Sequence, residues 1–402
     1  MPDRSLDQMI DRLLEEERFS RRGFVRRTGA AALATSSVGT LLAACGGVEG
    51  TKTTTGGVAK AVTGNHPKVA IDELNFSNWP LYVEKQVLKT FDKRFGAKTR
   101  YTEEINDNEE FFAKVREALR RGRDVKRDIV VLTDFMAARW IRLGYAEPLD
   151  KRNIPNVSNL VENLASPVYD RERSYSLPWQ SGMTLIGYNP KKTGRKLTSV
   201  NDFFDPKFKG RVSFFSEWRD AAGLVAVGQG VKTADATKDD VLKAIEKLDE
   251  ENRKGQIRRF TGNDYTTDLA KGNLWVAMAY SGDLIQLQAD NPDLEYVIPE
   301  EGAMLWTDNM MIPKGAAHPY AAETMMNYVY DPVIAAKIAA YVNYVSPVEG
   351  AREELLKTDP EVAENELIFP PEEVRARLHP HPTFDDADER ELSEAFQKVI
   401  GA

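Results

Sequence analysis

Residues 69–103 read VAIDELNFSNWPLYVEKQVLKTFDKRFGAKTRYTE, and this stretch decides the fold. Residues 69–76 alternate apolar and polar side chains, which predicts a strand. Residues 83–95 have apolar side chains at helical spacing, and Gly96 follows where a C-terminal helix cap belongs. Residues 99–103 again have the pattern of a strand. The stretch therefore predicts a β-α-β unit.

The same alternation continues downstream. Residues 108–121 have helical spacing, and residues 128–132 (DIVVL) form a short apolar run typical of a buried strand. A helix is expected from Phe135 to Gly144, with Asp134 as its cap. Repeated β-α units imply a parallel sheet covered by helices, and such sheets bind ligands beyond the carboxyl ends of their strands. Functional residues are therefore expected in the loops from strand to helix.

A second α/β block is expected to begin near Leu185. Its predicted elements are a helix opening at 198–203, strands at 210–215 and 274–280 with a helix at 241–251 between them, a strand at 306–312, and helices at 319–330 and 333–342. No sequence repeat joins the two blocks. The pattern predicts an α/β protein of two lobes.

Composition excludes several function classes. The chain has 402 residues, of which 42% are hydrophobic and 29% charged, so it is not collagen, a disordered chain or a polytopic membrane protein. A net charge of -8 without a basic tract argues against a nucleic-acid partner. With one cysteine and four histidines, an intramolecular disulfide is impossible and a Cys/His zinc cluster is not expected. We therefore expect no metal and no cofactor.

The N-terminus has the features of an export leader. Residues 20–27 read SRRGFVRR, which resembles a twin-arginine signal, and residues 28–44 are mostly small and apolar, without a charge. The run Leu42-Ala43-Ala44-Cys45 resembles the lipobox of bacterial lipoproteins. A membrane helix is the alternative, but the run is shorter than the about 20 strongly apolar residues that spanning requires.

This leader predicts where the protein works. Residues 1–44 are expected to be a signal peptide, and Cys45 to become the lipidated first residue. Residues 45–67 are rich in Gly and Thr and predict a flexible tether. The protein is thus expected to be anchored by lipid at the outer face of the cytoplasmic membrane.

Several segments, in a consistent order, resemble the spermidine/putrescine-binding proteins of ATP-driven polyamine importers. They are NWPLYV (78–83), DIVV (128–131), SVNDFFDPKFKGRVSFF (199–215), AMAYSGD (277–283), WTDNMMIPKGA (306–316) and NYVSPV (343–348). The resemblance implies a clamp like that of periplasmic binding proteins, with two α/β lobes, crossing hinge strands and ligand in the cleft between them. It places residues 68–180 and 309–345 in the first lobe, and 181–308 and 346–402 in the second. It implies a monomeric receptor, without catalytic residues, that serves an ABC permease.

The chemistry of a polyamine agrees with this resemblance. Its ammonium groups need carboxylates, and the methylenes between them need aromatic faces. Trp306 and Asp308 are two apart on a predicted strand and hence share a face. Glu217 and Asp220 lie between a predicted strand and a helix, where helix capping is the alternative role, with Arg219 neutralising one of them. For Trp306 and Asp308 the alternative is a core tryptophan and a capping aspartate.

The resemblance also assigns ligand contacts to one hydroxyl residue and to several aromatic residues. The predicted ligand-binding residues are Trp79, Tyr82, Thr133, Phe135, Glu217, Asp220, Tyr280, Trp306, Asp308 and Tyr344. The chain departs from the family where Pro80 and Leu81 replace a hydroxyl residue and an acid, and where Phe135 replaces the usual Tyr. One end of the cleft has therefore lost polar partners, and Asp134 is a candidate to restore the charge.

Other functions remain as alternatives. An exported hydrolase using Glu217 and Asp220 as paired carboxylates predicts turnover instead of stoichiometric binding. A receptor for a ferric ion needs Tyr/His ligands, and one for an amino acid needs an arginine for the carboxylate; neither set is evident. His379 and His381 (HPHP) have metal-ligand spacing, but no acidic or sulfur ligand completes a motif, and the prolines predict an extended tail.

Overall fold

The structure is a computed structural model that describes residues 62–105, 107–262 and 264–401. Its strands are β1 (Leu74–Asn78), β2 (Thr99–Glu103), β3 (Ile129–Thr133), β4 (Ser176–Tyr188), β5 (Val212–Phe215), β6 (Ile257–Thr261), β7 (Val276–Tyr280), β8 (Glu295–Val297), β9 (Ala303–Met311) and β10 (Leu378–Pro380). Its α-helices are α3 (Lys85–Phe95), α4 (Asn108–Arg120), α5 (Asp134–Arg142), α6 (Pro190–Thr193), α7 (Trp218–Gly228), α8 (Lys238–Arg253), α9 (Tyr265–Ala270), α10 (Ser281–Asp290), α11 (Pro319–Val329), α12 (Pro332–Val342), α13 (Ala351–Thr358), α14 (Pro360–Ala363), α15 (Glu372–Arg375) and α16 (Asp386–Ile400).

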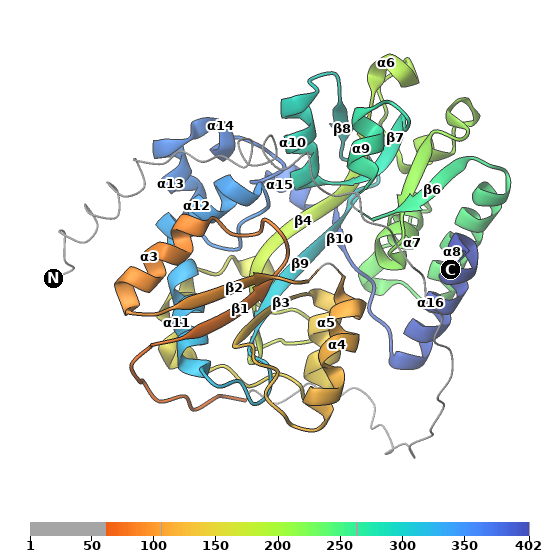
Figure 1. The fold of residues 1–402 in the computed structure, drawn as a ribbon. Helices are drawn as coiled ribbons and strands as arrows, with labels where there is room; N and C mark the ends of the chain where they lie inside the picture. Colours follow the sequence, from red (N-terminus) through yellow and green to blue (C-terminus); the bar gives the residue numbers. More distant parts are fainter. Residues whose placement is uncertain (1–61, 106, 263, 402) are drawn as a thin grey trace.

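The strands form one continuous sheet in the order β2-β1-β3-β9-β4-β7-β5-β6, with β10 beside β9 and β8 beside β4. Strands β1, β2 and β3 are parallel and form lobe I, whereas β5, β6 and β7 are parallel and form lobe II. The long strands β4 and β9 pair antiparallel and run from one lobe into the other, as Figure 1 shows across the middle of the molecule. The predicted two-lobed α/β fold with crossing strands is confirmed.

The opening β-α-β unit forms as its sequence pattern predicts. Strands β1 and β2 pair in parallel from Leu74 opposite Thr99. Helix α3 buries Val87 and Phe91, and it ends at Gly96, whose φ of 73° is the left-handed conformation that favours glycine. The first strand begins at Leu74, later than the predicted residue 69.

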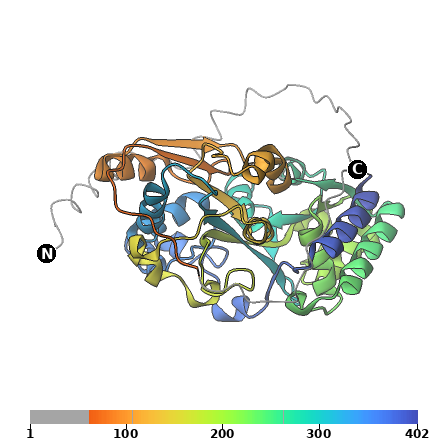
Figure 2. The ribbon, with the colours of Figure 1, turned by 90° about the horizontal axis from the view of Figure 1, so that it is seen from below.

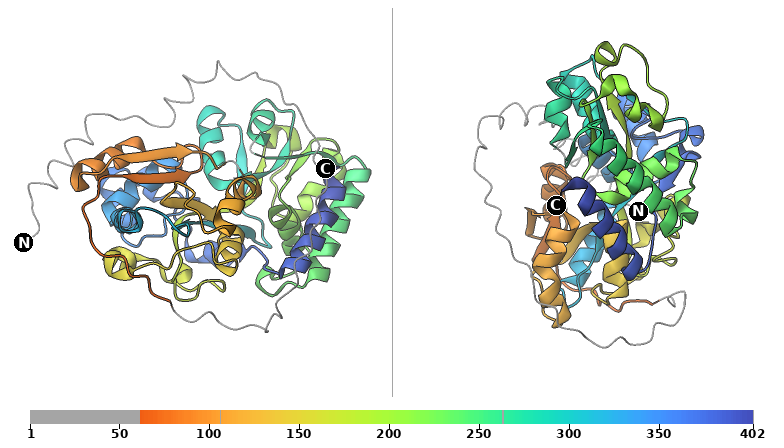
Figure 3. Two further views of the ribbon diagram at one scale, coloured as in Figure 1. Left: turned by 60° about the horizontal axis from the view of Figure 1, so that its bottom comes forward. Right: turned by 90° about the vertical axis from the view of Figure 1, so that its right-hand side faces the viewer.

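Each lobe covers its part of the sheet with helices. In lobe II the C-terminal helix α16 lies against α8, and both views of Figure 3 show the two helices side by side. The view from below in Figure 2 shows this helix pair at the end of the molecule opposite α3 of lobe I. The C-terminal segment thus completes lobe II.

The segment after residue 345 does not pass at once into lobe II. The buried side chains Ala351 and Leu355 of α13 pack in the same apolar core as Phe91 of lobe I. Leu367 and Val374 pack in the core of lobe II. We therefore propose that the chain crosses near Leu367, whereas the residue 346 boundary stays a prediction.

The end of the predicted flexible tether is docked on lobe I. Gly64 donates its N–H to the carbonyl of Leu149 at 3.0 Å, and His66 Nδ1 lies 2.7 Å from Oε1 of the fully buried Glu323. A Cβ on Gly64 would lie 2.2 Å from the carbonyl oxygen of Pro148, so this close approach requires glycine. Gly64 and His66 of the predicted tether are therefore held against lobe I, and the bounds of the tether stay a prediction.

The predicted signal peptide (1–44), Cys45 and the tether up to residue 61 lie outside the described residues. Within the described part of the chain, no helix has the length and apolar character needed to cross a membrane.

Candidate functional site

Asp308 lies where the crossing strands meet lobe I. On β9 it is opposite Thr133 of β3 and Gln180 of β4. Its carboxylate accepts hydrogen bonds from the hydroxyls of Thr133 at 2.7 Å and Tyr82 at 2.9 Å. The side chain is only 5% exposed, so these two hydroxyls provide hydrogen bonds that water would give to an exposed carboxylate. The structure thus brings together three of the predicted ligand-binding residues.

The carboxylate of Asp308 is buried, and its charged form has no cation in direct contact among the described residues. Burial raises the pKa of Asp308 to about 7, although the hydrogen bonds from Thr133 and Tyr82 lower it. None of the ion pairs among the described residues includes Asp308. A group in this state gains from the arrival of a positive charge.

Gln180 was missed by the sequence-based prediction. It is 2% exposed, and its carbonyl oxygen Oε1 has no hydrogen-bond partner among the described residues. Since directly opposite residues of paired strands share a face, Gln180 and Asp308 face the same side of the sheet. An unsatisfied buried acceptor costs about 1–3 kcal/mol, which a ligand N–H would recover.

A continuous row of aromatic rings runs from lobe I to lobe II past Asp308. Successive ring centroids are 6.4, 5.7, 5.3, 5.7 and 4.3 Å apart along the order Trp179, Tyr82, Tyr344, Trp306, Tyr280 and Phe215. Four of these rings were predicted, whereas Trp179 and Phe215 were not. The row thus places apolar ring faces at the junction of the two lobes.

A glycine on β4 makes room for the central indole of this row. Gly182 is opposite Trp306, and a Cβ on Gly182 would lie only 2.2 Å from Cζ2 of that indole. The Trp306 ring therefore lies flat against the backbone of β4. Its Nε1 is buried without a partner among the described residues.

Trp79 and Tyr82 come from the loop between β1 and α3. The indole of Trp79 donates from Nε1 to the carbonyl of Val131 at 3.1 Å, which ties this half-buried ring to β3. Leu81, one of the departures from the family, has a φ of 56°, and its N–H donates to Glu103 at 3.1 Å. This left-handed residue turns the chain sharply just before Tyr82.

Glu217 and Asp220 lie near the end of β5 in lobe II, as predicted, but both already have partners. Glu217 caps α7 by accepting from the backbone N–H groups of Arg219 at 2.7 Å and Asp220 at 3.1 Å. The capping alternative is therefore confirmed for Glu217. Asp220 accepts from the hydroxyl of Thr184 at 2.6 Å, and its Oδ1 lies 3.1 Å from Nε2 of His381.

Arg219 joins this cluster to Phe135 of lobe I. Its guanidinium carbon lies 3.9 Å from the centroid of the Phe135 ring and 4.4 Å from that of Trp218. It forms ion pairs with Glu217 at 2.9 Å and with Glu389 of α16 at 3.3 Å. Phe135 thus contacts a protein cation in this structure.

Burial and neighbouring charges act in opposite directions on the titration of this cluster. Burial raises the pKa of Glu217, although Arg219 lowers it. Burial lowers the pKa of His381, but Asp220 and Glu217 outweigh it, so the pKa lies above the ordinary value. The cluster therefore favours a protonated imidazole next to Asp220.

Two expectations about single residues are wrong. Asp134 does not cap α5: it is the first helical residue, Thr133 holds the cap position, and Asp134 accepts from Asn309 Nδ2 at 2.8 Å. His381 is not in an extended tail, because Leu378–Pro380 forms β10 beside β9 and the imidazole is 8% exposed.

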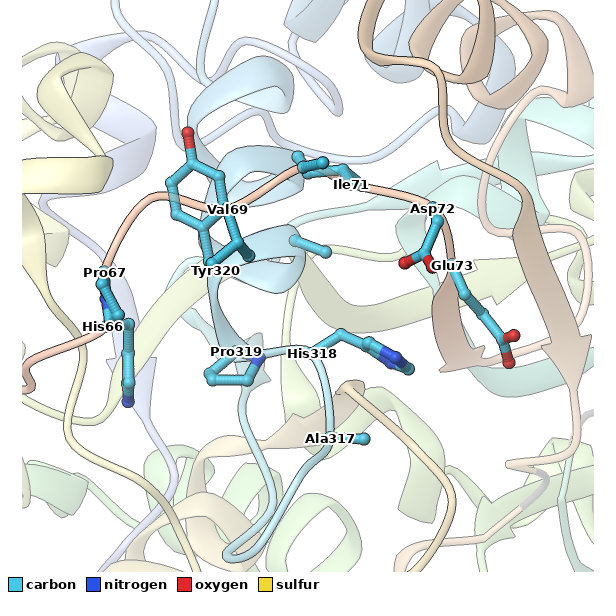
Figure 4. A pocket seen from close by; sticks show the side chains of 12 residues that line it. His66, Pro67, Val69, Ile71, Asp72, Glu73, Ala317, His318, Pro319 and Tyr320 are labelled. Atoms are coloured by element: carbon cyan, nitrogen blue, oxygen red, sulfur yellow. The ribbon is translucent and has the colours of Figure 1, made fainter.

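A pocket of about 200 Å³ lies on lobe I between residues 66–73 and the start of α11 (Figure 4). Its two imidazoles, His66 and His318, are paired with Glu323 and Asp128 outside the pocket lining. Among the described residues, no group of three or more His, Cys, Asp or Glu side chains is placed to hold a metal. The interlobe residues therefore form the stronger candidate site.

The fold and the site define a class: a two-lobed protein of the binding-protein type, with a buried carboxylate and a row of aromatic rings where its lobes meet. The model of the family "Bacterial extracellular solute-binding protein" matches residues 86–370, more than two thirds of the chain. The chain belongs to this family of solute-binding transport proteins.

Several characterised proteins are similar to this chain. The putrescine/cadaverine-binding protein of Pseudomonas aeruginosa is 27% identical over 357 residues, which are 85% of this chain and 97% of that protein. The spermidine/putrescine-binding periplasmic protein of Salmonella typhimurium is 28% identical over 304 residues, 74% of this chain and 83% of that protein. Among solved structures, a putative spermidine/putrescine ABC transporter protein of Listeria monocytogenes has 26% identity and a TM-score of 0.72, covering 82% of this chain and 98% of its own.

More distant structures share the fold alone. A GABA receptor protein at 17% identity has a TM-score of 0.66 and covers 82% of this chain and 98% of its own. The fold therefore does not decide the ligand, and the side chains of the site must do so.

Proposed function

We propose that this protein captures a linear amine of the polyamine class between its lobes and delivers it to the permease of an ABC importer. The observation that carries this proposal is Asp308, a buried carboxylate without a cationic partner among the described residues, next to the unsatisfied oxygen of Gln180. Together they offer a site for the N–H donors and the charge of an ammonium group.

The predicted ligand-binding residues take distinct roles in this proposal. Asp308, Tyr82, Thr133 and Gln180 surround the ammonium head, and the rings of Trp306, Tyr280 and Tyr344 cover the methylenes that follow. Trp79 and Phe135 border the site on the side of lobe I. The relatives named for putrescine, cadaverine and spermidine support this ligand class.

The proposal describes a receptor that binds its ligand without chemical change. We expect calorimetric titration with putrescine, cadaverine and spermidine to show saturation at one amine per chain, and chromatography to recover the amine intact. The hydrolase alternative predicts consumption of the ligand instead. Saturation by other classes of solute without any response to amines would contradict the assignment.

We also propose that Cys45 anchors the protein to the outer face of the cytoplasmic membrane. It is the only cysteine and follows Leu42-Ala43-Ala44 after the twin-arginine segment. Mass spectrometry of the membrane-purified protein should find an acyl-modified Cys45 as the first residue. An internal, unmodified Cys45 in that material would contradict the anchor.

A further inference from the structure

We propose that Arg219 and His381 are specificity residues, because each pairs with a carboxylate of lobe II and makes it unavailable to a second ammonium group. The site therefore prefers a linear amine whose far end is acylated and uncharged. This inference rests on the proposed function, because it assumes that one ammonium group binds at Asp308. It adds which amine the site selects. The chemical class is an N-acylated diamine.

Arg219 already neutralises Glu217. Its Nη1 lies 2.9 Å from Oε1 of Glu217, while the other oxygen of that carboxylate accepts the helix N–H groups. The guanidinium is 3% exposed and lies between the rings of Phe135 and Trp218. A second ammonium group would therefore meet a fixed cation where the sequence predicted an open carboxylate.

His381 pairs with Asp220 in the same way. The imidazole Nε2 lies 3.1 Å from Oδ1 of Asp220, and the hydroxyl of Thr184 donates to that same oxygen. Asp220 and His381 are 4% and 8% exposed, so the pair is shielded from water. The ring of His381 also contacts Phe135, with centroids 6.4 Å apart.

The unsatisfied atoms at the two ends have opposite chemistry. Opposite Asp308 the orphan atom of Gln180 is an acceptor, Oε1, while Nε1 of Trp306 in the aromatic row is an orphan donor. In the lobe II cluster the orphan atoms are nitrogens, Nε of Arg219 and Nδ1 of His381, and the first is an obligatory donor. A donor-bearing ammonium head matches the first end, and the carbonyl oxygen of an acyl group matches the second.

The test is the ratio of two dissociation constants, that of putrescine divided by that of N-acetylputrescine, measured by calorimetry on the full chain. We expect a ratio above one for the natural protein. Arg219→Met keeps a long unbranched side chain but removes the stacked guanidinium and its charge, and His381→Gln keeps a donor for Asp220 without the charge. Each should lower the ratio at least threefold, because a carboxylate becomes available to the second ammonium group.

Arg211→Met is the matched control, because Arg211 stacks on Trp275 at the opposite end of β5 and lies outside the site. Its ratio should equal that of the natural protein. If Arg219→Met does not fold, His381→Gln alone decides. A natural ratio below one, or a change under threefold in every folded variant, overturns the inference while amine binding persists. Absence of binding for both amines in the natural chain and the variants instead refutes the proposed function, and the inference with it.

Discussion

At the scale of single residues, the charge of Asp308 affects both the fold and the ligand. Its pKa of about 7 lies well above the ordinary value of 3.8, so the folded protein holds this proton more tightly than the unfolded chain. The stability that the proton provides is complete below pH 3.8 and is lost as the pH rises through 7. At pH 8 the buried charge costs on the order of 4 kcal/mol.

The first prediction is that Asp308→Asn stabilises the protein free of ligand. At pH 8 the variant should melt at a higher temperature than the natural chain in calorimetric scans, because Asn has no charge to bury. At pH 4.5 the two should melt at similar temperatures, since Asp308 is then protonated. A lower melting temperature of the variant at pH 8 would show that the carboxylate instead holds the fold together.

Asp170→Asn is a suitable contrast for this experiment. Asp170 accepts from the backbone N–H groups of Ser174, Tyr175 and Ser176 at 2.7 to 3.0 Å. An amide cannot accept all of these bonds as well as a carboxylate does. The contrast variant should therefore melt at a lower temperature at pH 8 and still bind amines.

The second prediction concerns the pH dependence of binding. An alkylammonium keeps its proton up to about pH 10. Below neutrality its attraction to Asp308 is therefore limited only by the protonation of that carboxylate. Affinity should be level above pH 7 and fall by up to about tenfold per unit below it. Calorimetry in the His381→Gln background removes the titration of that imidazole. An affinity that stays level from pH 5.5 to 8.5 would rule out Asp308 as the counter-ion.

At the scale of elements, strand β4 shows why parts of the site escaped prediction. Its first half contains Pro178, Gln180, Ser181 and Gly182, which give neither alternation nor an apolar run, so the second block was placed near Leu185. In the fold this half is buried and pairs with the crossing strand β9, whereas β7 pairs only with the second half of β4, from Thr184 to Tyr188. Long-range pairing overrode local propensity, and Gln180 was missed for that reason.

The residues that could be predicted are those with a local signal or a family counterpart. Thr133 follows the apolar run of β3, and Trp306 and Asp308 share the face of a strand, so their proximity was foreseeable. The pairing of Asp220 with His381 was not, because 161 positions separate them and β10 has three residues. Such contacts depend on the tertiary fold.

The third prediction tests how β4 supports the aromatic row. Gly182→Ala places a methyl group where the Trp306 indole lies, so the ring must move away. We expect amine affinity to fall at least tenfold and stability to fall by about 1–3 kcal/mol. Gly262→Ala is the control, since no atom lies within 4 Å of its added Cβ. Unchanged affinity in Gly182→Ala would show that the indole does not contact the ligand.

At the scale of the whole molecule, the lobes touch directly as well as through the crossing strands. Arg139 of α5 in lobe I lies 3.6 Å from the carboxylate of Glu389 in lobe II, and Phe135 stacks on Arg219. Asp308 and Trp306 lie on the crossing strand β9 itself, and the aromatic row passes from Tyr82 of lobe I through Trp306 to Tyr280 of lobe II. A ligand that reaches groups of both lobes therefore favours the state in which the lobes are together.

The fourth prediction follows from this geometry. Saturating amine should reduce the radius of gyration in small-angle scattering, because only the closed state lets both lobes contact the ligand. Glu389→Gln weakens the direct contact and should enlarge the radius of the ligand-free protein. Scattering profiles that do not change with saturating amine would indicate a rigid body instead of a clamp.

The central claim is that this protein binds an amine through the buried charge of Asp308. Its most direct test is a calorimetric comparison of the natural chain with Asp308→Asn, titrated with putrescine, spermidine and N-acetylputrescine at pH 8. Removing one partner of a desolvated ion pair costs about 2 to 5 kcal/mol, so we expect every amine that binds the natural chain to bind the variant roughly 30-fold to several-thousand-fold more weakly. Equal affinity of the two proteins for all three amines would contradict the claim.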